Sequence, residues 1–169
     1  MKKILKTAST LILAIFAAAL AYGGWGYLDA IKDADALKLR ADALIAENRG
    51  GQSLGDARLQ QLLQVQDPNF QGHSGVDMIT PGAGVTTITQ SAAKRLAFEA
   101  FKPGIGKIRQ TGYALGLESE LTKEQILALW LDTLEMGKGP DGWVTGFHRA
   151  SEKVFGKAPS DLQETEFLS

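Results

Sequence analysis

The feature that most constrains this chain is an apolar run over residues 8–28, close to its N-terminus. About twenty apolar residues are enough to cross the hydrocarbon core of a bilayer. Cations before the run and amphipathic aromatic residues at its far end favour one membrane-spanning helix with a cytoplasmic N-terminus. These residues are Lys2, Lys3 and Lys6, and Tyr22, Trp25 and Tyr27. We therefore predict that residues 1–28 anchor the chain in a membrane, with the remainder on the side away from the cytoplasm.

A cleaved signal peptide is the alternative interpretation of the same run. Ala19-Leu20-Ala21 forms an A-x-A site after a short apolar region, as in secretory signals. The apolar run continues past that site, which favours the uncleaved anchor. Under either interpretation the rest of the chain is exported.

Composition excludes several other classes of function. The 169 residues suit a single domain, and a formal net charge of −1 gives no general attraction to nucleic acid. Cysteine is absent, which excludes a disulfide framework, a thiolate nucleophile and thiolate-bound metal. A membrane is therefore an expected partner, and nucleic acid is not.

Helical patterns account for most of the remaining chain. We expect residues 29–58 to form an amphipathic helix, as a stalk or first helix leaving the membrane, and a linker, with the domain over 59–169. Capping boxes predict helices that start at Thr87 and Thr122, the first ending near Phe101. Further helices are expected over 105–120 and 143–155, with a loop at 137–142 and a short last helix capped by Ser160. Strand signals are almost absent, so the predicted fold class is all-α with one N-terminal transmembrane helix.

Two sets of polar residues are candidates for a functional site. His73 and Asp77 could share a helix face and bind a metal with Asp67, but no fourth ligand is evident; the simpler interpretation is that Asp67 caps or bridges and His73 is hydrogen-bonded. Four cations form the second set, and the helix that follows the Gly-rich turn at 81–84 could hold an anion at its first amides. A solvated helix face is the simpler interpretation of that set. The cations are Lys94, Arg95, Lys107 and Arg109.

The order of several short motifs is more informative than any one of them. VQDPNFQGHSGVD at 65–77 resembles V-E-D-x-x-F-x-x-H-x-G-x-D, the first motif of the biosynthetic peptidoglycan glycosyltransferases. These are the domains of penicillin-binding proteins and monofunctional transglycosylases that polymerise lipid II. GVTTITQSAAK at 84–94 is similar to their second motif, G-x-S-T-I-T-Q-Q-x-x-K, with Thr86 in place of serine. GKIRQTGYALGLE at 106–118, LTKEQILALWLD at 121–132 and KVFGKAPSDL at 153–162 resemble the motifs that follow.

The resemblance implies a mainly helical, lysozyme-like lobe on the outer, periplasmic side of a bacterial inner membrane, and a set of site residues. Phe70 and His73 would shape the groove, and a further set of polar side chains would contact substrate. That set is Thr86, Thr87, Gln90, Lys94, Lys107 and Arg109. No organic cofactor is implied, and the divalent cation that members of the family can use has no evident ligand set here.

The departures from the family pattern concern the catalytic positions. Gln66 and Gln110 stand where the family has its general-base glutamate and a second glutamate near the donor pyrophosphate. Glutamine cannot take a proton near neutral pH. The segment between Asp77 and Gly84 is also shorter than the family's apolar segment, and the chain ends before a fifth, arginine-containing motif. We therefore expect a shortened, catalytically impaired relative that binds glycan strands, a lipid-linked precursor or another envelope protein.

Two other functions stay open at this point. The chain could be an active glycosyltransferase that polymerises lipid II with another base, for which Asp67 is the candidate. Alternatively, it could be a structural docking subunit of a membrane complex, with its groove unused.

Overall fold

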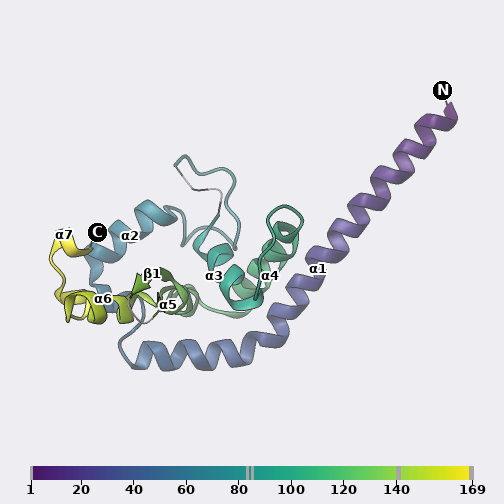
Figure 1. Ribbon diagram of the computed structural model, residues 1–169. Helices are drawn as coiled ribbons and strands as arrows, with labels where there is room; N and C mark the ends of the chain where they lie inside the picture. The colour runs from purple at the N-terminus through teal and green to yellow at the C-terminus, as the bar shows by residue number, and fades with distance from the viewer. Residues whose placement is uncertain (1, 83, 85, 140–141, 168–169) are drawn as a thin grey trace.

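A computed structural model describes residues 2–82, 84, 86–139 and 142–167. Its first element, α1, is one continuous helix from Lys2 to Ala46 that bends partway along (Figure 1). The helix contains an 18-residue window with a mean hydropathy of 1.7 that is 6% buried, so it is long and apolar enough to cross a membrane. The predicted boundary at residue 28 is therefore not a break in secondary structure.

The C-terminal half of α1 belongs to the core of the domain and is not a separate stalk. Its small and apolar side chains are buried against α4 (Gly106–Glu120) and α5 (Lys123–Thr133); they include Ala30, Ala34, Ala41 and Leu44. α5 is the central helix, since every residue from Ile126 to Asp132 is buried. α3 (Ile88–Ala97) packs against both α4 and α5. The mainly helical fold agrees with the prediction from sequence.

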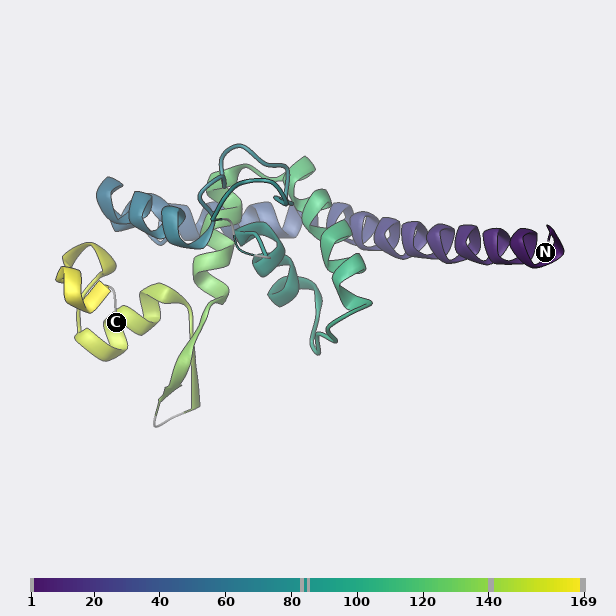
Figure 2. The same cartoon turned by 90° about the horizontal axis from the view of Figure 1, so that it is seen from above.

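Shorter elements surround this helical core. A 3₁₀ turn at Gly51–Leu54 leads into α2 (Asp56–Gln66), and an irregular segment connects α2 to α3. After α5 come a hairpin of β1 (Glu135–Gly139) and β2 (Gly142–Thr145), then α6 (Phe147–Phe155), a 3₁₀ turn at Pro159–Asp161 and α7 (Glu164–Phe167). The hairpin projects from the body of the domain (Figure 2).

The hairpin corrects the predicted loop at 137–142 and the predicted helical start at 143. The strands are antiparallel, with Lys138 opposite Trp143, and aromatic and β-branched residues such as Trp143 and Val144 favour this pairing over a helix. Gly137, Gly142 and Gly146 have φ values of +118°, +108° and +94°, which other residues rarely adopt. The helix α6 therefore starts only at Phe147.

Two helix boundaries also differ from the predictions. α3 ends at Ala97 because Phe98 is extended and its ring packs edge-on against Phe101, with centroids 5.6 Å apart. Ser160 lies inside the 3₁₀ turn and does not cap α7, which begins at Glu164. Both predicted capping boxes are confirmed, with Thr87 and Thr122 as the N-caps.

Glycine allows α1 and α4 to approach each other closely. A Cβ atom on Gly112 would collide with the carbonyl oxygen of Gly23, and one on Gly116 would lie 2.8 Å from the carbonyl oxygen of Tyr27. The two helices run in the same direction, because Ile108 lies at Gly23 while Gly116 lies at Tyr27 and Ala30. This contact holds α4 directly beside the apolar part of α1.

Candidate functional site

The opening segment of the first motif folds around the buried carboxylate of Asp67. Its Oδ2 accepts hydrogen bonds from His73 Nε2 and from the Ile88 amide, both at 2.8 Å. The Gly75 amide donates to His73 Nδ1 at 3.0 Å, so Nε2 carries the imidazole proton. Asp67 thus bridges the connecting segment to the first turn of α3, as the simpler interpretation of this residue predicted.

This arrangement lacks the geometry that two of the alternatives drawn from sequence required. The metal hypothesis required a helix over His73 and Asp77, and that segment is irregular; within the described ranges no three His, Cys, Asp or Glu side chains form a metal-binding group. The anion hypothesis required the first amides of α3, but the Ile88 amide already binds Asp67 and the Gln90 amide binds Thr87 Oγ1 at 3.0 Å.

Thr87 and Gln90 of the second motif have structural roles at the same place. Both are buried. Thr87 Oγ1 donates to the Gly75 carbonyl at 2.7 Å, and Gln90 Oε1 accepts from the Thr87 amide at 3.3 Å. Gln90 Nε2 donates in turn to Thr111 Oγ1 of α4 at 3.1 Å, which places the Gln90 side chain at the edge of an open groove.

A further ion pair, which the sequence patterns did not indicate, supports the segment that connects α2 to α3. Glu118 Oε1 accepts from Thr89 Oγ1 at 2.5 Å and from Lys123 Nζ at 2.7 Å. Lys123 also donates to the His73 carbonyl at 2.6 Å and lies 4.7 Å from the centroid of the Phe70 ring. Phe70 and His73 are therefore buried side chains that support the site from below, and they do not line the groove. No helical or strand periodicity relates these residues in the sequence, so their contacts could not be predicted from it.

The two glutamines at the family's glutamate positions lie in different environments. Gln66 is the exposed last residue of α2. Gln110 is 2% exposed, and its Nε2 donates to the Gln90 carbonyl at 2.6 Å. Its Oε1 is buried with no hydrogen-bond partner in the described part of the chain. An ionised glutamate at this place could not make the donation that Gln110 makes.

Arg109 points toward α1 and away from the groove. Its guanidinium pairs with Asp29 at 2.6 Å and lies 5.1 Å from the ring centroids of both Trp25 and Phe98. Arg109 therefore connects α4 to α1. This was not visible in the sequence, because the partner carboxylate lies 80 residues away.

An open groove of about 540 Å³ lies between the 76–84 segment and the start of α4. Its lining includes Asp77, Met78, Thr80, Gln90, Lys107 and Thr111. Thr111 was not predicted, although its i, i+4 spacing from Lys107 places both on one face of a helix. Hydrogen bonds from the Thr80 hydroxyl and from the Ile79 and Thr80 amides hold the pKa of Asp77 well below its usual range.

A second, apolar cleft of about 450 Å³ adjoins this groove between α1 and α4. Ala19, Leu20, Gly23 and Tyr27 form one wall, and Ile108 and Leu115 contribute to the other. Lys107 and Thr111 line both spaces. The polar groove and the apolar cleft therefore meet at these two side chains.

Lys107 is the cation at that junction. Its Nζ donates to Thr86 Oγ1 at 2.8 Å, and it has no carboxylate partner among the residues that the structure describes. Burial lowers the pKa of Lys107, which reflects the desolvation of its ammonium group. An anion in the groove would relieve that cost, so Lys107 can receive one.

Lys94 and Arg95 line a different, polar pocket of about 450 Å³ between the end of α3 and the hairpin. The Lys94 ammonium lies 5.4 Å from the centroid of Phe101, and Arg95 donates to Ser91 Oγ at 2.6 Å.

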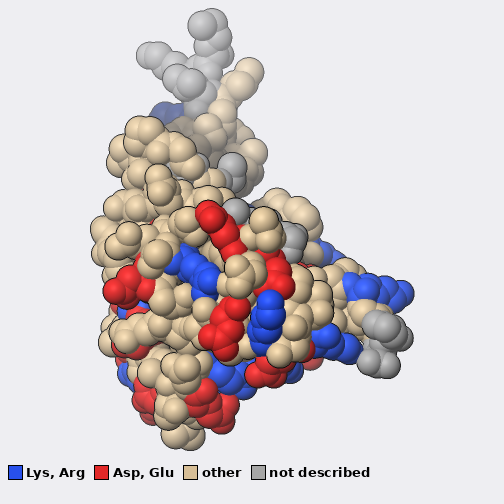
Figure 3. Space-filling model, turned by 90° about the vertical axis from the view of Figure 1, so that its left-hand side faces the viewer, with Lys and Arg blue, Asp and Glu red and all other residues tan. Residues whose placement is uncertain are grey.

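On the face of the molecule in Figure 3, basic and acidic side chains are intermixed, with no large surface of one sign.

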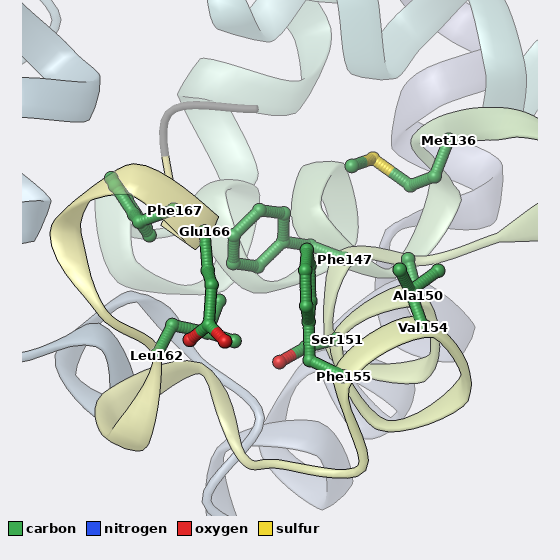
Figure 4. Close-up of a pocket in the computed structure, with 9 residues that line it drawn as sticks. All are labelled: Met136, Phe147, Ala150, Ser151, Val154, Phe155, Leu162, Glu166 and Phe167. Carbon is green, nitrogen blue, oxygen red and sulfur yellow. The ribbon is translucent and has the colours of Figure 1, made fainter.

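The C-terminal segment encloses a smaller cavity of about 210 Å³ (Figure 4). Aromatic side chains from α6 and α7, among them Phe147, Phe155 and Phe167, line it. Glu166 pairs with Lys157 at 2.8 Å, and Ser151 Oγ donates to the Lys157 carbonyl at 2.7 Å. No residue predicted for the site reaches this cavity.

Comparison with known proteins places these motifs in a family. The profile of the family described as "Transglycosylase" matches residues 52–169. A biosynthetic peptidoglycan transglycosylase of Marinomonas sp. is 33% identical over 109 residues, which is 57% of this chain and 47% of the relative. Penicillin-binding protein 1F of Bacillus subtilis is 29% identical over 73% of the chain and 19% of the relative, and penicillin-binding protein 1B of Escherichia coli is 25% identical over 63% and 14%. The chain thus spans about half of the first relative and less than a fifth of the others.

Proposed function

Because the chain belongs to the transglycosylase family, we propose that it is a membrane-anchored protein of the cell envelope that binds a lipid-linked peptidoglycan precursor and is impaired in polymerising it. In this proposal α1 crosses the inner membrane with its N-terminus in the cytoplasm and holds the domain on the outer side. Binding of glycan strands or of another envelope protein would be secondary to this role.

The position of Lys107 carries the proposal. Its ammonium lies where the polar groove and the apolar cleft between α1 and α4 meet, and it lacks a carboxylate partner within the described ranges. A ligand that joins an anionic group to a long apolar chain matches both spaces at once. Lipid-linked sugar pyrophosphates have this chemistry, with the pyrophosphate next to Lys107 and the lipid next to α1.

The chemistry at the family's two glutamate positions, and at Asp67 and Asp77, supports the impairment. Glutamine at positions 66 and 110 cannot accept a proton near neutral pH, and the loss of general-base action alone slows a reaction by roughly 10²–10⁴-fold. Asp67 is not positioned to replace it, because its carboxylate is buried and binds His73 and the Ile88 amide. Asp77 lines the groove, but its lowered pKa makes it a weak base.

Binding of a fluorescent lipid II analogue to the full-length protein in detergent or nanodiscs tests the proposal. Lys107→Met should weaken binding roughly tenfold or more, since a hydrogen bond to a charged group contributes about 1.5–3 kcal/mol. Lys138→Met is the matched control, because Lys138 is an exposed lysine on the hairpin, outside both spaces. Equal affinity for wild type and Lys107→Met, or no binding by wild type, would overturn the proposal.

A polymerisation assay tests the impairment separately. Wild type should polymerise glycan far more slowly than an ordinary transglycosylase. Gln66→Glu combined with Gln110→Glu should not restore the ordinary rate. Ordinary activity of wild type that is abolished by Asp67→Asn in a folded protein would instead support the alternative base. Stable co-purification of an envelope protein by wild type that binds no lipid II analogue would support the docking subunit.

A further inference from the structure

Three arginines from different parts of the chain converge on the buried carboxylate of Asp132, at the end of α5. Arg40 of α1 donates to Oδ2 at 2.7 Å, while Arg49, which follows α1, and Arg149 of α6 donate to Oδ1 at 2.6 and 3.2 Å. The elements that carry this cluster lie away from the N-terminal half of α1 (Figure 1). Other residues line the groove and the apolar cleft, so the cluster is a separate feature of the molecule.

The cluster holds more positive charge than its carboxylates neutralise. The carboxylates bonded to its arginines are Asp132 and Glu47, which accepts from Arg49 at 3.3 Å. Among the described residues, three guanidinium groups, which stay charged at any physiological pH, therefore face two carboxylates. A buried carboxylate is costly without a cationic partner, but Arg49, the least exposed of the three, already supplies one. The remaining two guanidinium groups add repulsion between like charges, which an anion from outside would relieve.

Arg40 and Arg149 also have unused hydrogen-bond donors at the surface. Their side chains are 45% and 59% exposed. A guanidinium group has five N–H donors, and within the described ranges each of these two donates one hydrogen bond, to Asp132. Because they bind the two oxygens of one carboxylate, both groups lie within reach of a single further oxyanion. The planar guanidinium group suits a carboxylate in particular, since the two can form paired hydrogen bonds.

We propose that Arg40 and Arg149 form a docking site for an acidic segment of a partner protein, with a carboxylate of that segment bridging the two guanidinium groups. The single charge of a carboxylate matches the surplus charge of the cluster. A free anion would gain little, because one exposed ion pair contributes little by itself, whereas a polypeptide adds contacts of its own around the bridge. A bilayer is not the occupant, because the cluster lies away from the apolar half of α1. The site is independent of the proposed function at Lys107.

Binding of a fluorescein-labelled octaglutamate to the full-length protein in phosphatidylcholine nanodiscs tests the proposal by fluorescence anisotropy. Arg149→Gln should weaken binding roughly fivefold, and added salt should reduce the difference. This variant should keep its fold, because Asp132 still pairs with Arg40 and Arg49, and thermal unfolding checks that it does. Lys32→Gln is the matched control, since it also removes one positive charge, from a side chain of α1 that is 72% exposed. It should change the affinity by less than about twofold.

The outcomes separate this inference from the proposed function. Equal affinities of Arg149→Gln and Lys32→Gln for octaglutamate, or no binding by wild type at low salt, would overturn the docking site. Inorganic phosphate that binds wild type and loses affinity in Arg149→Gln, while octaglutamate does not, would identify a small oxyanion as the ligand and also overturn it. Loss of octaglutamate binding in Lys107→Met but not in Arg149→Gln would place the peptide in the groove, against the proposal. Arg149→Gln should bind the lipid II analogue as wild type does, so failure of lipid binding leaves the docking site intact.

Discussion

Two polar regions on either side of the first turn of α3 differ in how their hydrogen bonds are used. Around Asp67, carboxylate, imidazole, hydroxyl and amides bind one another, and Asp67 and His73 are 2% and 9% exposed. Around Lys107, the ammonium binds one hydroxyl and borders two open spaces. The first region is closed to ligands, and the second is available to them.

This difference separates the motif residues by role. Asp67, Phe70, His73 and Thr87 match the family's motifs but are buried in the closed region, where they hold the connecting segment against α3 and α5. Lys107 matches as well, and it lies in the open region. A chain can therefore keep the first group for its fold while the chemistry of the groove changes.

Asp67→Ala should produce the largest effect. It leaves two buried donors, His73 Nε2 and the Ile88 amide, without their acceptor, and each costs about 1–3 kcal/mol. We expect the free energy of unfolding to fall by about 4 kcal/mol, measured by urea denaturation in detergent with tryptophan fluorescence. Gln66→Ala, one residue earlier and exposed, should change it by less than about 0.5 kcal/mol. Equal effects of the two substitutions would mean that Asp67 does not hold a closed region.

Gln110→Glu should be the next most disruptive change. It replaces the donation from Gln110 to the Gln90 carbonyl with a buried carboxylate beside an acceptor oxygen, at a cost of about 3 kcal/mol near neutral pH. Burial would raise the pKa of this glutamate in the folded state. The destabilisation should therefore be greatest above that pKa and decrease as the pH falls through it, because the protonated acid can donate again.

Gln66→Glu provides the control for that change, since the same substitution at an exposed position should be close to neutral at every pH. Unfolding free energies measured from pH 5 to pH 8 compare the two. A Gln110→Glu protein as stable as wild type at pH 8 would show that position 110 can take a carboxylate.

Gly112→Ala tests the contact that forms the apolar cleft. The added methyl group would collide with the Gly23 carbonyl, so α1 and α4 must separate, at about 1–3 kcal/mol for overpacking. Gly24→Ala is the matched control, because a Cβ there has no neighbour within 4 Å. Thermal unfolding of both variants in the same detergent measures the difference, and a stabilised Gly112→Ala protein would contradict the close packing of α1 against α4.

Local chemistry explains which parts of the fold and site could be predicted. The capping boxes at Thr87 and Thr122 involve atoms three residues apart, so the sequence contains all the partners. The hairpin depends on left-handed glycines and on pairing across a turn, which a helical pattern in the following residues concealed. The motif order predicted the family, whereas the division of motif residues between the closed and open regions depends on contacts between distant segments.

Asp77→Asn should have the smallest effect. It should increase the affinity for the ligand, whereas the substitutions in the closed region should reduce stability. Asp77 lines the groove that Lys107 also lines, and its lowered pKa keeps it negative at any physiological pH. Asparagine can still accept from the Ile79 and Thr80 amides through Oδ1 and loses the acceptor of Asn69 Nδ2 at Oδ2. The turn over residues 77–80 should therefore keep its conformation, while a charge that repels an anionic ligand is removed. Affinity for the lipid II analogue should rise roughly two- to threefold, an effect that added salt reduces. If affinity falls instead, Asp77 contributes to binding through its charge, and the groove must be organised around a cationic or hydroxyl group of the ligand as well as its anion.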